Sequence, residues 1–357
     1  MFLAENSIDT RNKKMKKKVR LEDVGTEAGV SKSAVARALG NYGSVSEEVR
    51  KRVLNAAKKI GYEPDQIARS LKTKRTNTIG VIISDITTYF FTSVVRGIAD
   101  VASQSGYDLV LCNTDEDPEK ENKFLRVLVG RNVDGLIISV SGKNTYLKKL
   151  VRAGLPIILL DRRVEDLETT QLVVDNENGA YEAVTYLIRL GHRRIGIING
   201  LAYIQTTEER FNGYKKALQD NRIRLDPQLV KYGDFKMAKA KEVTRELLDI
   251  KNPLSALFIS NEAMITGALL TLRERNINIP EQIAIIGFDD PVWGPLLDPP
   301  LTAVSQPAYP MGTMACQTLL QKINEPGREK RSFEELVLKP KLIVRGSCGK
   351  KISLPQN

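Results

Sequence analysis

This chain of 357 residues is poor in the side chains from which metal centres and disulfide frameworks are built. It contains one histidine and three cysteines, and the cysteines, Cys112, Cys316 and Cys348, stand far apart. An odd number of widely spaced cysteines argues against a disulfide framework and is typical of a protein of the reducing cytoplasm. The cysteines also lack the spacing of metal ligands, so we expect a cytoplasmic location and no metal site.

The sequence also lacks the signals of membrane insertion, secretion and common catalysis. No apolar run reaches the roughly 18–20 residues of a membrane span, and the basic stretch 11–20 is followed by Leu-Glu-Asp instead of an apolar segment. A Ser-His-Asp triad would have to use His192, which stands at the end of an expected helix. Neither a G-x-x-x-x-G-K-S/T phosphate loop nor a G-x-G-x-x-G after a strand occurs. We therefore expect neither an enzyme nor a cofactor.

Positive charge is abundant but unevenly spread along the chain. Residues 1–76 carry 18 Lys and Arg against 9 Asp and Glu, although the whole chain has a net charge of only +11. A basic domain on a near-neutral body is the electrostatic pattern of a DNA-binding head. We interpret the lysine-rich residues 1–18 as a disordered basic tail.

Residues 21–39 predict two short helices separated by Gly29-Val30-Ser31. Gly29 suits a tight corner because a left-handed backbone costs glycine little, and Ser31 can cap the second helix. Two helices joined in this way form a helix-turn-helix, whose second helix enters the major groove of DNA. On this pattern alone, an ordinary helical hairpin is an equal alternative.

A third helix and a short linker complete the amino-terminal part. Residues 44–48 supply a serine cap and acidic residues for a helix that Gly61 ends. We therefore expect a three-helix DNA-binding domain over residues 19–64. The polar, basic residues 65–76 follow it, and the segment 66–72 is too short to be helical alone in water. We expect a hinge that becomes ordered only when something holds it.

From residue 79 onward, short apolar strands alternate with helices. This pattern predicts parallel sheets covered on both faces, and the number of units exceeds one compact sheet, so we infer two α/β subdomains. Ligands bind beyond the carboxyl ends of the strands in such sheets. We expect strands at 79–83, 109–113, 135–140, 157–161, 172–175, 195–199, 230–233, 256–260 and 283–288, and helices at 94–106, 120–130, 147–154, 179–191, 207–221, 237–248 and 263–276.

Polar side chains follow many of these strands. Each of them alone is more often a helix cap or a turn residue. As a repeated set at one edge of the sheets, they suit hydrogen bonding to a polyhydroxylated ligand. The set is Asp85, Asn113, Asp161, Asn199, Asn261 and Asp289.

Several short motifs occur along the chain. They are Asp-Val at 23–24 with Ala-Gly-Val-Ser at 28–31, Val-Ser-Glu-Glu-Val-Arg at 45–50, Gly-Tyr-Glu-Pro at 61–64, Val-Asp-Gly-Leu-Ile at 133–137, Gly-His-Arg-Arg-Ile at 191–195 and Ile-Gly-Phe-Asp-Asp at 286–290. Any one of them is a weak signal. Together and in this order, they resemble the LacI/GalR family of bacterial transcription regulators, over roughly Val19 to Gly346.

The resemblance implies an α/β fold in which an all-α helix-turn-helix headpiece precedes two doubly wound parallel-sheet subdomains of the periplasmic-binding-protein-like type I. The core is then 77–349. Its amino-terminal subdomain comprises about 77–175 plus 306–336, and its carboxy-terminal subdomain about 176–305 plus 337–349. The resemblance also implies a homodimer formed through the core and a pseudo-palindromic operator in double-stranded DNA.

The resemblance assigns the DNA contacts to the second helix and the hinge. In the hinge, a leucine matches the residue that wedges into the minor groove, where partial unstacking kinks the duplex. The chain departs from the family where two alanines replace the usual Thr and Ser of the second helix, which removes hydroxyl contacts to phosphate. The DNA-contacting residues are Lys32, Ser33, Ala34 and Arg37 in the helix and Leu71 and Lys72 in the hinge.

By the same resemblance, an effector binds between the core subdomains. Aromatic platforms against the C–H faces of a sugar, with Asp, Arg and Asn at its hydroxyl edges, suit this ligand class. Arg162 and Arg163 beside Asp161 favour a ligand with a carboxylate or a phosphate, so we place a sugar acid ahead of a neutral sugar. The matched residues are Asp85, Phe90, Asp161, Arg210, Phe235, Asn261, Asp289 and Gln306, and we add Arg162 as the neighbour of Asp161.

Two positions near this site depart from the family pattern. The usual Asn-Asp pair after a strand is Asn261-Glu262 here, and Tyr89 replaces a common proline. Both changes leave the identity of the ligand open.

We therefore predict a sequence-specific transcriptional regulator, most simply a repressor, whose operator affinity is controlled by a sugar or sugar acid. A transport-type sugar-binding protein is the main alternative, and the basic helical head argues against it. A catabolite-control regulator with a phosphoprotein corepressor is disfavoured because Pro310 and Gln317 stand where that subgroup has an acidic residue and an arginine. The sequence leaves open whether the effector is an inducer or a corepressor, which operator is bound, and whether the chain forms a dimer or a higher oligomer.

Overall fold

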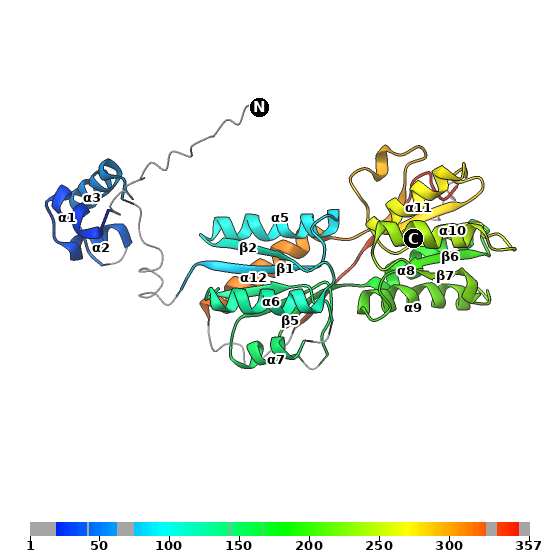
Figure 1. Ribbon diagram of the computed structural model, residues 1–357, viewed down its shortest axis with the longest axis horizontal. Coiled ribbons are helices and arrows are strands. Elements are labelled where there is room, and N and C mark those ends of the chain that lie inside the picture. Colours follow the sequence, from blue (N-terminus) through cyan, green and yellow to red (C-terminus); the bar gives the residue numbers. More distant parts are fainter. Residues whose placement is uncertain are drawn as a thin grey trace, which may run out of the picture. The chain divides into compact units, whose positions relative to one another are not determined.

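The computed structural model describes residues 19–40, 43–62, 75–142, 144–165, 167–325 and 334–349. The chain divides between Thr76 and Asn77 into two compact units, here called the headpiece and the core (Figure 1). The predicted basic tail lies outside the described residues, as do Leu71 and Lys72 of the predicted hinge. Among the described residues, no helix is long and apolar enough to cross a membrane.

The headpiece contains the three helices that the sequence predicts. Each is too short to be stable alone, so their apolar faces pack together into one small core. Ser46 caps the third helix and Gly61 ends it in a left-handed conformation. The helices are α1 (Leu21–Ala28), α2 (Lys32–Gly40) and α3 (Glu47–Ile60), and the fully buried residues at their centre are Val24, Val35 and Val53.

The corner between α1 and α2 forms as expected. Gly29 has a φ of 63°, and Ser31 Oγ accepts a hydrogen bond from the backbone N–H of Ala34 at 3.3 Å. The corner also needs a second glycine, because a Cβ at Gly25 would lie 2.9 Å from the carbonyl oxygen of Val30. Gly25 therefore lets the turn fold closely against α1.

The first subdomain of the core is a parallel sheet with the strand order β11-β5-β4-β3-β1-β2. Helices α5 and α12 pack on one face, and α6 and α7 pack on the other (Figure 1). The elements are β1 (Thr78–Ile83), α5 (Tyr89–Gln104), β2 (Asp108–Asn113), α6 (Pro118–Gly130), β3 (Gly135–Ile138), α7 (Thr145–Arg152), β4 (Ile157–Leu160), β5 (Thr170–Val174), α12 (Ala308–Asn324) and β11 (Glu335–Leu338).

The second subdomain has the strand order β12-β10-β9-β8-β6-β7, parallel except for β12. Helices α8 and α9 pack on one face, and α10 and α11 on the other. The elements are α8 (Asn176–Arg189), β6 (Ile195–Asn199), α9 (Gln205–Asp220), η1 (Pro227–Leu229), β7 (Val230–Tyr232), α10 (Met237–Leu248), β8 (Ala256–Ile259), α11 (Glu262–Glu274), β9 (Ala284–Phe288), η2 (Gly294–Leu296), β10 (Thr302–Ser305) and β12 (Lys341–Ile343).

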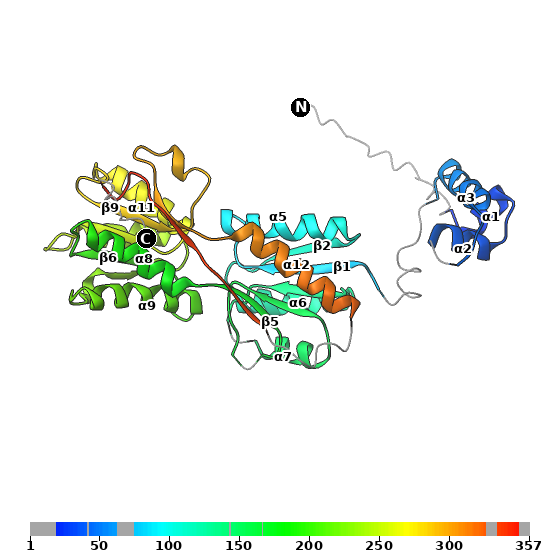
Figure 2. The same ribbon diagram turned by 180° about the vertical axis from the view of Figure 1, so that it is seen from behind.

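The chain passes between the two sheets three times, after β5, after β10 and after β11. Figure 2 shows the later passages as the orange and red segments that run between the two subdomains. The residue patterns did not predict β10, α12, β11 or β12. Three of these are short strands, and β11 and β12 pair with strands far away in the sequence.

Several expectations about the core are wrong in detail, and two of them bear on its packing. Helix α5 begins at Tyr89, five residues before the expected start at Val94, because Thr88 caps it. The strands are not all buried on both faces either, since the edge strands β2 and β11 expose Leu111 and Val337. An edge strand has only one neighbour to cover it.

Candidate functional site

A pocket of about 480 Å³, including the solvent at its mouth, opens at the carboxyl ends of the strands of both sheets. Asp85, Asp161, Asn261 and Asp289 reach it from the ends of β1, β4, β8 and β9. All nine residues that the sequence predicted for an effector site line this one pocket. The predicted lining is Asp85, Phe90, Asp161, Arg162, Arg210, Phe235, Asn261, Asp289 and Gln306.

Two strand-end residues of the predicted polar set do not line the pocket. Asn113 accepts a hydrogen bond from the backbone N–H of Ile86 at 2.8 Å, and Asn199 donates to the carbonyl of Thr207 at 2.9 Å. Asn113 ties the loop before α5 to β2, and Asn199 ties the first turn of α9 to β6. For these two positions, the interpretation as a turn residue is correct.

Five further residues complete the lining, and sequence reasoning missed them. Thr88 stands just before α5 and Phe91 stands in its first turn. The sequence had placed the start of this helix five residues too late. The others lie in loops or at helix starts where residue type alone gives no signal. The added lining residues are Thr88, Phe91, Glu116, Thr206 and Lys236.

The backbone is strained at the pocket. Asp161, Phe235 and Asp289 have φ values of 70°, 56° and 89°, in the left-handed region that non-glycine residues rarely adopt. Such residues persist where the surrounding structure holds them, and they cluster at ligand sites. At Asp161 and Asp289, the turn directs a carboxylate to the pocket immediately after a buried strand.

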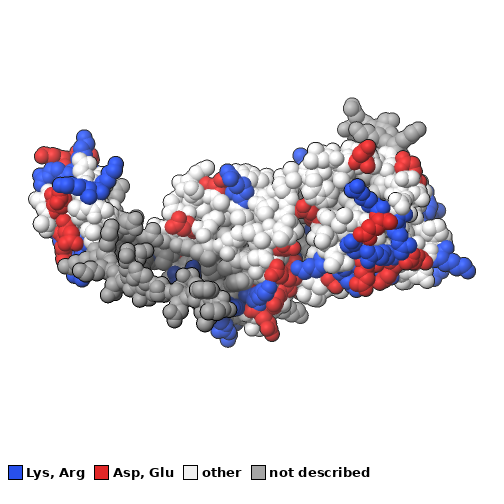
Figure 3. Space-filling model, turned by 45° about the horizontal axis from the view of Figure 1, so that its top comes forward, with Lys and Arg blue, Asp and Glu red and all other residues white. Residues whose placement is uncertain are grey.

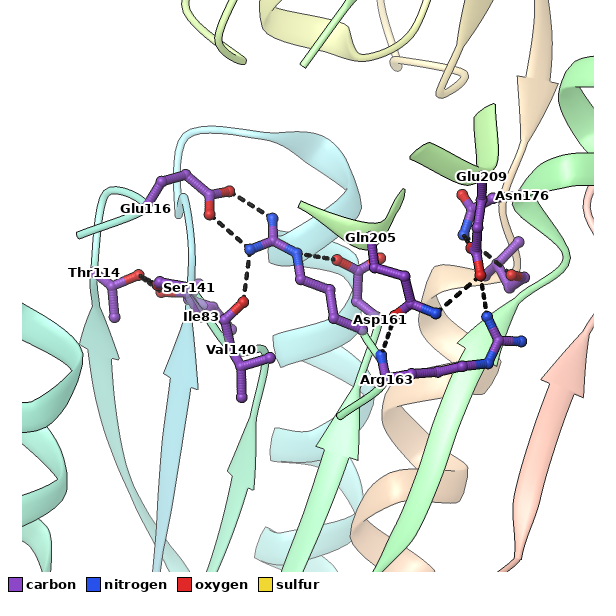
Figure 4. A network of polar contacts seen from close by, with 12 residues as sticks. Ile83, Thr114, Glu116, Val140, Ser141, Asp161, Arg163, Asn176, Gln205 and Glu209 are labelled. Carbon is purple, nitrogen blue, oxygen red and sulfur yellow. Dashed lines mark hydrogen bonds and ion pairs between the residues drawn. The ribbon is translucent and has the colours of Figure 1, made fainter. Parts of the chain in front are cut away.

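Arg162 is held by a buried ion pair. Its NH1 and NH2 each donate to Glu116 at 2.6 Å, and NH1 also donates to the carbonyl of Val140 at 2.7 Å. The Arg162 and Glu116 side chains are only 5% and 7% exposed. Nε of Arg162 makes no hydrogen bond to the described residues, although it lies 3.5 Å from a carboxylate oxygen of Asp161. Figure 4 shows Glu116 and Val140 in this network.

Arg210 holds the opposite side of the pocket. It donates from Nε to Asn176 at 2.9 Å and from NH1 to the carbonyl of Ser260 at 2.5 Å, and its guanidinium lies 3.9 Å from the centre of the Phe288 ring. Burial raises the pKa of Asp289 to about 6, although the charge of Arg210 opposes the rise. The two arginines of the pocket therefore already face carboxylates.

Arg163 does not line the pocket. Its guanidinium pairs with Glu209 and, at 2.9 Å, with Glu335, and its backbone N–H donates to Gln205 at 2.5 Å (Figure 4). The interpretation of Arg163 as a ligand-facing arginine is therefore wrong. Together with the pairing of Arg162, this removes the main support for a sugar acid ahead of a neutral sugar.

The predicted DNA-reading residues lie on one exposed stretch of α2. Lys32, Ser33 and Arg37 are exposed, and Ala34 is half-buried. Lys32 forms an exposed ion pair with Glu22 at 2.7 Å. Figure 3 shows basic and acidic side chains side by side on the headpiece, so its charge is mixed on the face that is drawn.

The raised pKa of the Asp289 carboxyl predicts that the stability of the core depends on pH. Because the folded chain holds this proton more tightly than the unfolded chain does, the contribution of Asp289 to stability is greatest at low pH. It falls as the pH rises from about 4 to about 6, by about 3 kcal/mol in all. We expect Asp289→Asn to remove this part of the decline, as measured by urea unfolding of both proteins from pH 4.5 to 7. Parallel pH profiles would contradict the assignment.

Comparison with known proteins gives matches along most of the chain. Residues 20–65 match the family described as "Bacterial regulatory proteins, lacI family", and residues 184–348 match the "Periplasmic binding protein-like domain". The chain is 34% identical to the HTH-type transcriptional regulator RegA of Clostridium saccharobutylicum, over 92% of this chain and 98% of that one.

Two solved structures are each similar to more than nine-tenths of the chain. The complex of the transcriptional regulator CelR with cellobiose has 30% identity and a TM-score of 0.69, over 92% of this chain and 99% of that one. The lac repressor dimer bound to operator and the anti-inducer ONPF has 25% identity and a TM-score of 0.82, over 94% and 100%.

Proposed function

From the premise that the chain belongs to the lacI family of bacterial regulatory proteins, we propose that it is a transcriptional repressor whose operator affinity changes when a neutral sugar binds in its core. The observation that carries this proposal is the pocket at the carboxyl ends of both sheets, in a chain that also has a helix-turn-helix headpiece. Membership in a family of transcriptional regulators decides against the transport-type alternative.

The charge balance of the pocket favours a neutral sugar. Arg162 and Arg210 are buried, and Glu116, Asp161 and Asp289 face them in the same lining. The carboxylates accept hydrogen bonds from hydroxyl groups, and the aromatic rings offer apolar faces to C–H groups. A ligand carboxylate would instead add negative charge beside Asp161 and Asp289, whose pKa values burial already raises.

The neutral sugar is expected to act by biasing two states of a homodimer. An effector shifts such an equilibrium only by its differential affinity for the two states. The pocket is formed by both subdomains, so closure on a sugar changes their relative placement. In the proposed dimer, this change is passed to the two headpieces and sets whether both half-sites of an operator can be bound at once.

The proposal is tested by combining DNA selection with a sugar screen. An operator is first selected from a random DNA pool with the full chain, and its affinity is measured by fluorescence anisotropy. Cellobiose, ribose and glucose are then compared with glucuronate and galacturonate in thermal unfolding and in operator binding. We expect a neutral sugar to raise the melting temperature and change operator affinity. Stabilisation by the acids alone would overturn the choice of ligand, and failure to select any DNA would overturn the repressor.

Arg37 is expected to supply direct base readout. It is an exposed residue of α2, where an arginine reaches base edges in the major groove. Arg37→Ala should weaken binding to the selected operator about tenfold or more, with a smaller effect on random DNA. Anisotropy titrations against both DNAs measure the ratio. An equal loss on both would assign Arg37 to phosphate contact instead.

A further inference from the structure

Glu262 is an almost buried carboxylate at which three segments of the core meet. It is the first residue of α11, and 9% of it is exposed. Its Oε2 accepts a hydrogen bond from the backbone N–H of Tyr89, 2.5 Å away, at the start of α5. Burial raises the pKa of the Glu262 carboxyl, and the Tyr89 N–H and the nearby Trp293 side chain oppose the rise. Because α5 packs on the first sheet and α11 on the second, this carboxylate joins the two subdomains.

Hydrogen bonds connect Glu262 to the pocket. Its backbone N–H donates to Oδ2 of Asp289 at 3.1 Å, and Gln306 donates to Oδ1 of Asp289 at 2.5 Å. Asp289 and Gln306 line the pocket. A ligand that binds Asp289 would therefore contact a side chain that is also hydrogen-bonded to Glu262, the residue that joins the subdomains.

The Tyr89 N–H is a strong donor for this contact. The first amides of a helix have no partner within the helix, and the helix dipole favours negative charge beside them. Here the negative charge comes from the other subdomain. The contact depends on both departures from the family pattern, because a proline at 89 would have no N–H and an aspartate at 262 would be one methylene shorter.

We propose that the Tyr89–Glu262 contact is a latch that biases the ligand-free core toward the closed arrangement of its two subdomains. The latch lies beside the pocket, so opening the cleft must break a hydrogen bond to a nearly buried carboxyl group. Loss of such a bond in a site with little water changes an equilibrium about tenfold or more. A ligand then meets a pocket that is already partly assembled. Only this last consequence rests on the proposed function.

Tyr89→Pro removes the donor with little other change. Proline is favoured at the first position of a helix, where its missing N–H breaks no bond within the helix. Thr88 before it has φ −90° and ψ 143°, which is the conformation that a following proline requires. Tyr89→Ala is the matched control, because it removes the half-exposed ring and keeps the N–H. Glu262→Ala removes the acceptor from the other subdomain.

The opening of the cleft is measured on the full chain without any ligand. Lys123 on α6 and Glu208 on α9 are exposed, one on each subdomain, and are replaced by cysteines that carry spin labels. The three native cysteines are buried. An excess of unlabelled chain suppresses signals between copies. Double electron–electron resonance then gives the distribution of distances between the subdomains, and fluorescence of the single tryptophan, Trp293, reports on the latch itself.

We expect Tyr89→Pro and Glu262→Ala each to reduce the ratio of closed to open populations about tenfold, with a red shift of the Trp293 emission in Glu262→Ala. Tyr89→Ala should match the wild type. If both donor and acceptor variants keep the wild-type distance distribution, the latch is overturned. It is also overturned if Tyr89→Ala opens the cleft as much as Tyr89→Pro does. Because no sugar is added, neither outcome depends on the identity of the effector.

Discussion

Glu116→Gln is expected to lower the free energy of unfolding of the core by about 3–5 kcal/mol. Glu116 accepts from both NH groups of Arg162 in a buried, bidentate pair. Glutamine keeps the shape but turns an amide NH₂ toward one guanidinium N–H, so a charge and an acceptor are lost together. Arg162 then remains charged in the pocket with Asp161, 3.5 Å away, as its remaining acid.

The neighbouring residue provides the control. Asp115 pairs with Lys120 at 2.6 Å, and both side chains are about half exposed. Asp115→Asn is the same chemical change in the same loop, and we expect it to cost less than about 1 kcal/mol because water screens the pair. Urea unfolding followed by circular dichroism at pH 7 compares the two variants. Equal losses would show that the buried pair contributes no more than an exposed one.

The alternation of strands and helices could be predicted because each strand of a covered parallel sheet is a continuous apolar run. Residues 195–199 and 237–248 illustrate this, since β6 and α10 have the predicted bounds. The strands at 302–305 and 335–338 could not be found in this way. They are short, and β11 is partly exposed, so their place depends on pairing with β9 and β5, respectively.

The pocket lining could be predicted in large part because parallel strands bring their carboxyl ends to one edge. Asp161 and Asp289 were identifiable as polar residues directly after apolar runs. Glu116 was not, because its role depends on Arg162, 46 positions away. Arg163 shows the converse error, since adjacent residues after a strand point in different directions and only one of the two arginines lines the pocket.

Gly312→Ala is expected to destabilise the first subdomain by about 3 kcal/mol or more. Helices α5 and α12 approach each other through Gly97 and Gly312, and a Cβ at Gly312 would lie 2.0 Å from the carbonyl oxygen of Val94. The obstacle is backbone, so no side-chain rotation can relieve it and the helices must move apart. Both helices begin at the pocket, α5 beside Phe90 and α12 just after Gln306. Their separation should therefore weaken effector binding as well as folding.

Gly130→Ala separates this effect from the general effect of losing a glycine. Gly130 is the last residue of α6, and a Cβ there would meet nothing within 4 Å. Alanine reduces the freedom of the unfolded chain and favours the helix, so this variant should be about 0.4–1 kcal/mol more stable than the wild type. The same substitution thus has opposite signs at two helical glycines, and urea unfolding of both variants measures the difference. A stable Gly312→Ala protein would mean that α5 and α12 can separate without cost, and the positions of Phe90 and Gln306 would then not depend on this helix pair.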